Sequence, residues 1–159
     1  MCTEPSRLPS NRKRPIHQPV LSVGNGSVIV YLTVCVAGRQ PVLANPESQD
    51  RLREAWLKAS TWLVGRYVIM PDHLHLFCSP GVDPAESLTS WVAYWKRLVS
   101  FRIGHSFWQK NFWDTQLRRQ DSYALKWDYV RNNPVRAGLV PRTQDWVYQG
   151  EMNALPWHD

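Results

Sequence analysis

A chain of 159 residues with 43% hydrophobic side chains is long enough to bury a core of its own, which favours a single domain. No stretch has the length and apolarity of a membrane span, and the first residues lack a signal-peptide core, so we expect a cytoplasmic protein. Three cysteines without a CxxC pair argue against a disulfide framework or a cysteine zinc finger, and we expect Cys35 and Cys78 to be buried thiols. The formal net charge of +6 favours a polyanionic partner such as nucleic acid, although many small proteins are basic without binding it.

The first half of the chain is predicted to be a tail followed by a strand and a helix. Residues 1–27 carry four prolines and a basic cluster, so we predict a disordered basic tail. The β-branched run from 28 to 36 predicts a well-buried strand. Asn45 followed by Pro46 is a typical helix start, and the helix is expected to continue to about residue 61.

Two strands in succession are predicted next, over 62–70 and 73–79, with Pro71 and Asp72 forming the turn between them. The residues from 83 to 86 then resemble a capping box in spacing, which predicts the start of a second helix.

The remaining segments are an aromatic stretch, a third helix and a C-terminal extension. Residues 107–118 include a possible short strand, and 121–132 predict the helix, because a proline at 134 cannot continue it and restrains residue 133. Residues 141–159 form an extension that either packs on the domain or is flexible. The order β-α-β-β-α-β-α predicts an α+β fold, with one antiparallel sheet, two helices on one of its faces and an added C-terminal helix.

Two histidines in the third predicted strand are the most informative residues of the chain. His73 and His75 are two residues apart, so their side chains point to one face, while Leu74 and Leu76 point to the other. Two adjacent imidazoles on a strand whose opposite face is buried are suited to supply two ligands of a metal site. The alternative is that the pair is an ordinary surface feature.

Tyr129 and Asn133 provide complementary chemistry near the end of the third predicted helix. Their spacing of four residues places them on one helical face. The amide oxygen of Asn133 is a plausible ligand for a hard divalent ion, and the phenol of Tyr129 can act as a nucleophile. The alternative for Tyr129 is a core or rim position without chemistry.

Cations and aromatic rings alternate over the segment from Tyr94 to Arg142. The segment carries ten Lys or Arg and three Asp, a local net charge of +7. Phosphates bind the cations and unstacked bases bind the rings, so this composition suits a single strand of nucleic acid. The alternative is that most of these aromatic residues belong to the core.

These pieces together resemble a known family. His73-Leu74-His75 resembles the His-hydrophobic-His signature of the HUH single-strand nucleases. The aromatic stretch from Phe107 to Asp114, Arg118, and the run Asp128-Tyr129-Val130-Arg131-Asn132-Asn133-Pro134-Val135-Arg136-Ala137-Gly138-Leu139-Val140 resemble the REP-associated tyrosine transposases. The resemblance covers residues 28–140, which we predict to be one transposase domain with the ferredoxin-like HUH fold.

The resemblance implies an enzyme that cuts and rejoins single-stranded DNA at hairpin-forming repeats. Tyr129 would attack a DNA phosphate and form a 5′-phosphotyrosine link, and one Mg²⁺ or Mn²⁺ would be held by His73, His75 and Asn133. The protein would act as a monomer or a homodimer, associated with the nucleoid through DNA. Four arginines are the expected phosphate contacts: Arg118, Arg119, Arg131 and Arg136.

Three rival interpretations are weighed against this one. A histidine-triad nucleotide hydrolase needs a third alternate histidine, and that position is Phe77. A structural zinc site could use both strand histidines with Cys78 and His105, but Cys78 should point to the opposite face. The third is a non-catalytic DNA-binding protein that keeps the fold.

Overall fold

The computed structural model describes residues 27–103 and 107–159, so all but the last residue of the predicted tail lies outside the described part of the chain. A five-stranded antiparallel sheet, in the order β4-β1-β3-β2-β5, is covered by helices on both faces. The elements are β1 (Val30–Cys35), a 3-10 turn η1 (Ala37–Arg39), α2 (Pro46–Lys58), β2 (Trp62–Ile69), β3 (His73–Pro80), α3 (Leu88–Ile103), β4 (Trp113–Gln116), α4 (Tyr123–Arg131), α5 (Asn133–Arg136), η2 (Thr143–Asp145) and β5 (Gln149–Glu151).

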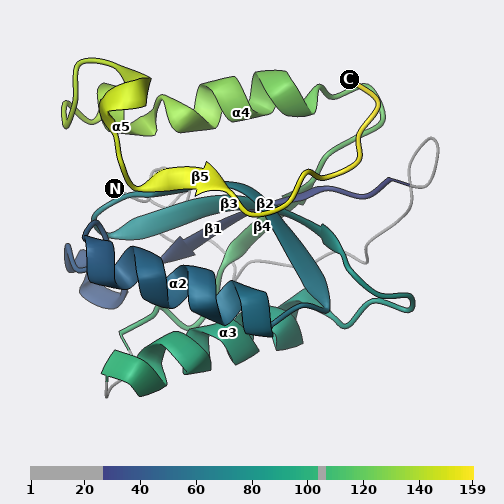
Figure 1. Ribbon diagram of the computed structural model, residues 1–159, viewed down its shortest axis with the longest axis horizontal. Coiled ribbons are helices and arrows are strands. Elements are labelled where there is room, and N and C mark those ends of the chain that lie inside the picture. Colours follow the sequence, from purple (N-terminus) through teal and green to yellow (C-terminus); the bar gives the residue numbers. More distant parts are fainter. Residues whose placement is uncertain (1–26, 104–106) are drawn as a thin grey trace, which may run out of the picture.

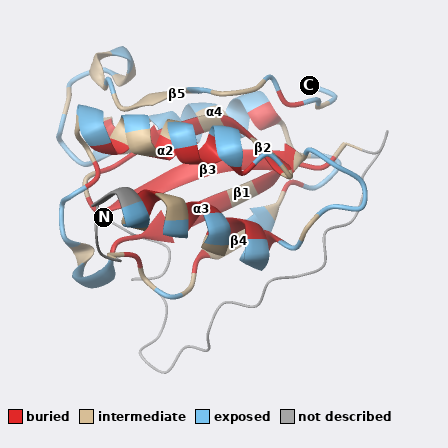
Figure 2. Ribbon diagram, turned by 60° about the horizontal axis from the view of Figure 1, so that its bottom comes forward, coloured by how far each residue is buried: buried red, intermediate tan, exposed pale blue. Residues whose placement is uncertain are grey.

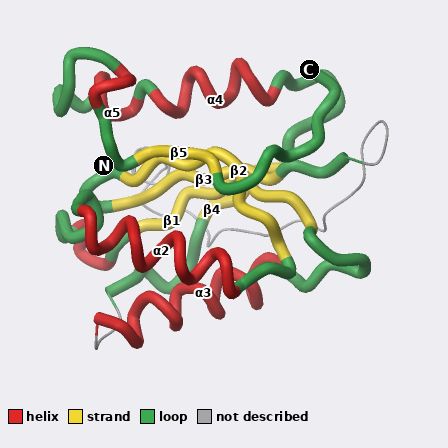
Figure 3. Tube along the Cα trace, in the orientation of Figure 1, coloured by secondary structure: helices red, strands yellow, loops and turns green. Residues whose placement is uncertain are grey.

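The helices form two layers on opposite sides of the sheet. Figure 1 shows α2 and α3 together below the strands and α4 with α5 above them. Figure 3 shows the strands as a single layer between these two groups of helices. The predicted α+β class is confirmed, with two helices on one face and the C-terminal helix on the other.

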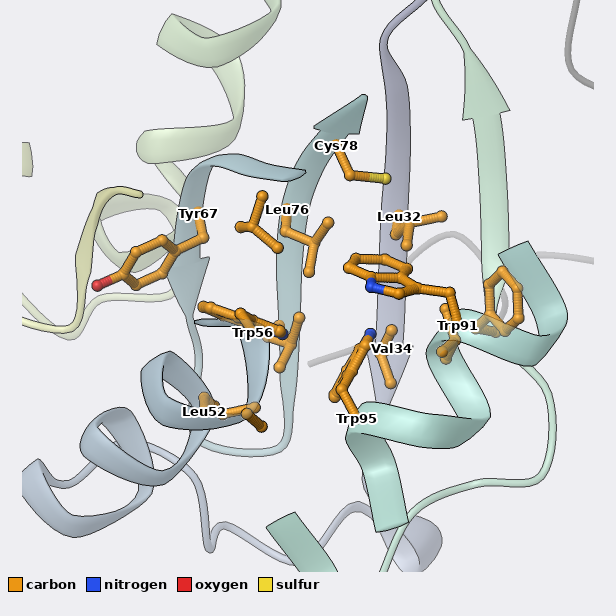
Figure 4. Close-up of a cluster of buried hydrophobic side chains, with 14 of the residues drawn as sticks. Leu32, Val34, Leu52, Trp56, Tyr67, Leu76, Cys78, Trp91 and Trp95 are labelled. Carbon is orange, nitrogen blue, oxygen red and sulfur yellow. The ribbon is translucent and has the colours of Figure 1, made fainter. Parts of the chain in front are cut away.

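The larger core lies between the sheet and the helices α2 and α3, where the inner helix surfaces are buried (Figure 2). Trp56 and Trp95, from the two helices, meet edge to face with ring centroids 6.0 Å apart, as Figure 4 shows among the side chains of this core. The indole nitrogen of Trp91 donates to the carbonyl of Ala59 at 2.7 Å, which satisfies a buried donor at the end of α2. Large aromatic side chains therefore fill this core and hold α2 and α3 together.

The two cysteines in the described part of the chain differ. Cys78 is a free thiol, fully buried among these apolar side chains. Cys35 is disulfide-bonded, so the expectation of two buried thiols is correct for Cys78 alone.

The helix starts show which local signals the chain uses. Asn45 caps α2 as predicted, since its side-chain oxygen accepts the backbone N–H of Ser48 at 2.8 Å. The predicted capping box at 83–86 is wrong, because α3 begins at Leu88 and the hydroxyl of Ser87 accepts the N–H of Ser90. Glu86 is held instead by β2, where its carbonyl accepts the indole N–H of Trp62 at 2.7 Å.

The C-terminal segment adds a fifth strand that the sequence did not indicate. β5 pairs with the edge of β2, with Arg66 opposite Glu151 and Val68 opposite Gln149. Leu155 then packs into a smaller core between the sheet and α4. Within the described residues, no helix is long and apolar enough to cross a membrane.

Candidate active site

The histidine pair lies on the face of the sheet that α4 covers. Phe77, two residues beyond His75, packs against Tyr123 and Trp127 of α4 with centroid separations of 5.0 and 6.5 Å. Leu74 and Leu76 belong to the opposite core, beneath α2 and α3. The predicted alternation along this strand is therefore confirmed.

Both imidazoles are buried and lie side by side. His73 is 1% exposed and His75 is 2% exposed, and their ring centroids are 4.8 Å apart with the planes nearly perpendicular. The strand β3 pairs with β1 on one side and with β2 on the other. Its backbone therefore fixes the positions from which the two imidazole side chains extend.

Hydrogen bonds to the Nδ1 atoms orient the two rings. Nδ1 of His73 is 2.7 Å from a carboxylate oxygen of Asp72. Nδ1 of His75 is 2.7 Å from the hydroxyl of Tyr31 and 2.9 Å from that of Thr33, both on β1. Side-chain partners on Nδ1 are the usual way in which a protein sets the orientation of metal-binding histidines.

Burial and nearby charge keep His75 in its neutral form. Burial lowers the pKa of His75 well below its ordinary value, and the charges of His73 and of Arg136 on α5 act in the same direction. Burial alone would raise the pKa of Asp72, but the hydrogen bond from His73 contributes to holding that pKa well below its usual range. Metal coordination requires a neutral imidazole, which is the form that these effects favour for His75.

The helix α4 presents Tyr129 to solvent. Ser122 caps the helix by accepting the N–H of Leu125 at 3.2 Å, and Tyr123 and Val130 are its buried residues. Tyr129, on the outer part of this helix, is 68% exposed. Through Tyr123, α4 packs on the same sheet face of its own chain that carries the histidine pair.

Arg136 contacts Tyr129, and its positive charge acts on His75. Its guanidinium lies over the ring of Tyr129 at 4.2 Å and donates to the carbonyl of Tyr129 at 2.8 Å. The same charge contributes to lowering the pKa of His75. Arg136 therefore contacts Tyr129 and also acts electrostatically on His75.

Asn133 adopts a different local structure from the one expected. Pro134 does not remove it from helical geometry, because Asn133 begins the short helix α5, with the proline in its first turn. α4 ends at Arg131, so Tyr129 and Asn133 are on two successive helices. The amide nitrogen of Asn133 donates to the carbonyl of Val130 at 2.7 Å, which makes its amide oxygen the atom it can offer to a ligand.

The expected donors are of the types that divalent ions bind. With Nδ1 of each ring engaged, Nε2 is the nitrogen that His73 and His75 would offer, and for His75 this requires Nδ1–H to donate to a β1 hydroxyl. Two imidazole nitrogens and one amide oxygen leave coordination positions for substrate. No group of three or more His, Cys, Asp or Glu that could hold a metal occurs in the described residues, so the third ligand would come from another residue type.

The four candidate arginines have different surroundings. Arg118 is 71% exposed at its side chain and lies 3.5 Å from Asp121, while Arg119 is exposed. Arg131 pairs with Asp128 at 3.2 Å on the surface of α4. Arg136 differs from the others because it contacts Tyr129.

Sequence reasoning missed the residues that orient the histidines: Tyr31, Thr33 and Asp72. Tyr31 and Thr33 alternate along β1 and lie directly opposite Phe77 and His75 in the register. The alternation was visible in the sequence, but the pairing of β1 with β3 was not. Asp72 could have been found as the carboxylate next to His73.

Two rival interpretations can be compared with this geometry. Phe77 occupies the position of a third histidine and is fully buried against α4, so it leaves no place for a histidine triad. Cys78 belongs to the opposite core, away from the histidine pair, as expected. His105, the remaining ligand of the zinc alternative, lies outside the described residues.

No family model matches the chain. It is 25% identical over 121 residues to the REP-associated tyrosine transposase of Escherichia coli, an alignment that covers 74% of this chain and 73% of that protein. A solved structure of a REP-associated tyrosine transposase bound to a REP hairpin superposes with a TM-score of 0.69 at 22% identity, over 86% of this chain and 82% of that one.

The antiparallel sheet between two helical layers, with a tyrosine-bearing helix over its outer face, has the fold of a solved tyrosine transposase. In sequence the chain is similar to the REP-associated tyrosine transposases, the family that its motifs resemble.

Proposed function

We propose that the protein is a metal-dependent transposase that cuts and rejoins single-stranded DNA at hairpin-forming repeats. The observation that carries this proposal is Arg136, which contacts Tyr129 and whose charge acts on His75, the buried partner of His73. The relative in the solved structure is bound to a REP hairpin, which supports hairpin DNA as the substrate here. We place this activity in the cytoplasm, on nucleoid DNA.

The proposed reaction is a transesterification at one phosphate. The phenol oxygen of Tyr129 attacks the phosphorus and the bond to the 3′ oxygen breaks, giving a 5′-phosphotyrosine and a 3′-hydroxyl, which receives the phenolic proton. A 3′-hydroxyl attacking that phosphotyrosine reverses the exchange and releases the tyrosine. No high-energy cofactor is consumed, because each phosphodiester bond replaces another.

The residues around the tyrosine supply positioning and charge. His73, His75 and the amide oxygen of Asn133 would hold Mg²⁺ or Mn²⁺, which would polarise the phosphoryl oxygen and neutralise developing negative charge. Arg136 lies over the tyrosine ring, where its charge favours the developing phenolate and the attacked phosphate. Arg118, Arg119 and Arg131 would bind phosphates outside the reacting bond.

The proposal is tested by detecting the covalent product of the protein with DNA. A labelled single strand carrying a hairpin repeat from near the gene is incubated with the protein and Mg²⁺ or Mn²⁺, and is then run on a denaturing gel. We expect a shifted band that Tyr129→Phe reduces to about a hundredth or less, because the nucleophile is lost. Tyr94→Phe, on α3 at the opposite side of the sheet, is the matched control and should keep the band.

Two outcomes would contradict this proposal. A band that persists in Tyr129→Phe would mean that another residue is the nucleophile. A wild-type protein that binds the hairpin tightly and never forms the band would instead be the alternative, a DNA-binding protein that keeps the transposase fold without the reaction.

A further inference from the structure

A cavity of about 300 Å³ is lined in part by α3. This helix lies on the opposite side of the sheet from α4 (Figure 1). One wall is a stripe of α3 that includes Lys96, Arg97 and Ser100, and the other is the segment 108–112 that leads into β4. The proposed transposition chemistry uses none of these residues.

The cavity contains a buried lysine, Lys96, for which the described residues supply no counterion. Lys96 is 9% exposed, and its ammonium donates to the backbone carbonyl of Gln109 at 2.9 Å. In the described part of the chain Lys96 forms no ion pair, and the cavity lining includes no carboxylate. An ammonium group can donate three hydrogen bonds, so two of its N–H groups are available to a ligand.

The burial of Lys96 disfavours the charged form of its side chain. Burial lowers the pKa of Lys96 to about 8, and no neighbouring charge offsets this effect. An anion in the cavity would supply the missing counterion, since a buried charge is normally paired. A methionine at this position would fill a similar volume without the desolvation cost of a buried charge. A ligand therefore explains the lysine better than packing does.

Other donors of the lining agree with an anionic ligand. Arg97 and Lys110 are exposed at the cavity and add two positive charges. The hydroxyl of Ser100 and the indole nitrogen of Trp108 are buried and have no hydrogen-bond partner in the described residues. Val92 and Phe112 provide apolar lining beside these polar groups, the usual composition of a small-molecule site.

We propose that this cavity binds a phosphate-bearing ligand of nucleotide size, with Lys96, Arg97 and Lys110 holding the phosphate. The volume supports this size, because it lies at the lower end of the range for ligand pockets and a bare phosphate would fill only a part of it. The nucleotide can be free, or it can be a unit of a bound single strand. The site does not depend on strand cleavage.

The experiment titrates the full chain by calorimetry with three probes: deoxyadenosine monophosphate, deoxyadenosine and inorganic phosphate. We expect the monophosphate to bind most tightly, and Lys96→Met and Lys96→Gln to weaken it at least tenfold. Lys96→Gln keeps a donor toward the carbonyl of Gln109, so its loss of binding reports the charge. Lys126→Met, an exposed lysine on α4, is the matched control and should bind as the wild type does.

Equal binding of the monophosphate by the wild type and both Lys96 variants would overturn the proposal, as would no binding at all. Nucleoside binding as tight as that of the nucleotide would overturn the role of the phosphate. A single-stranded oligonucleotide that displaces the monophosphate identifies the strand as the source, and one that does not identifies the free nucleotide. Tyr129→Phe should leave monophosphate binding unchanged, so failure of this site is distinguishable from failure of the proposed cleavage.

Discussion

At the scale of single residues, the histidine pair depends on neighbours that do not belong to the proposed metal set. Asp72 precedes His73 and accepts from its Nδ1, while β1 supplies the two hydroxyls at His75. An imidazole held in this way loses little rotational freedom when it coordinates a metal, so its affinity depends on the supporting group.

Asp72→Asn is expected to lower the affinity for Mn²⁺ by about 10- to 100-fold, because an amide oxygen is a weaker acceptor for the His73 N–H than a carboxylate. Calorimetric titration of the full chain with Mn²⁺ measures this change. Asp128→Asn, on the exposed surface of α4 beside Arg131, is the control and should not alter metal affinity. Unchanged affinity in Asp72→Asn would remove the role assigned to this carboxylate.

At the scale of elements, the position of α4 depends on side chains that pack closely against one glycine of β2. A Cβ on Gly65 would lie 2.6 Å from Cδ1 of Leu155 and 2.7 Å from the hydroxyl of Tyr123. That hydroxyl also accepts the backbone N–H of Arg66 at 3.1 Å. The C-terminal segment and the first turn of α4 therefore reach the sheet at the same place.

Gly65→Ala is expected to destabilise the protein by about 1–3 kcal/mol, because the added methyl overpacks this contact. Leu155→Ala removes some of the opposing atoms, so the double variant should lose less free energy of unfolding than the sum of the single changes. Chemical denaturation of the four proteins measures the coupling. Strict additivity would show that the contact at Gly65 is not the cause.

The elements that the sequence predicted well are those encoded locally. Alternation identified β3 and the faces of its histidines, and Asn45 identified the start of α2. The start of α3 was misplaced because Glu86 is held by a distant contact to β2 that no local pattern records. Likewise, β5 has only three residues and forms because β2 offers an unpaired edge.

The residues of the candidate site likewise separate into those that local sequence patterns indicate and those that depend on distant contacts. His73, His75 and Tyr129 were found from residue type and spacing, whereas the contact of Arg136 with Tyr129 depends on how α5 turns back. The local geometry expected for Asn133 was wrong, because Asn133 begins a short helix with Pro134 in its first turn.

At the scale of the whole molecule, the net charge of +6 should govern how strongly the protein associates with DNA. Arg118 contributes an exposed charge just beyond β4, at a distance of 3.5 Å from Asp121. Phosphate contacts of this kind position a strand without reading its sequence.

Arg118→Gln is expected to weaken binding of single-stranded DNA about equally for all sequences, and to lower the slope of log affinity against log salt by about one. Fluorescence anisotropy of a labelled oligonucleotide at several salt concentrations measures both quantities. Arg142→Gln is the control, because Arg142 forms a two-pronged ion pair with Asp145 at 3.0 and 3.1 Å. A slope that is unchanged in Arg118→Gln would exclude this arginine as a phosphate contact.

The outermost strands of the sheet restrict how two molecules can associate. β4 has four residues and β5 has three, so each outermost strand offers only a short length of backbone for pairing with another molecule. Short edges are a common protection against strand-by-strand aggregation. A homodimer that continued the sheet across one of these edges would therefore gain few backbone hydrogen bonds.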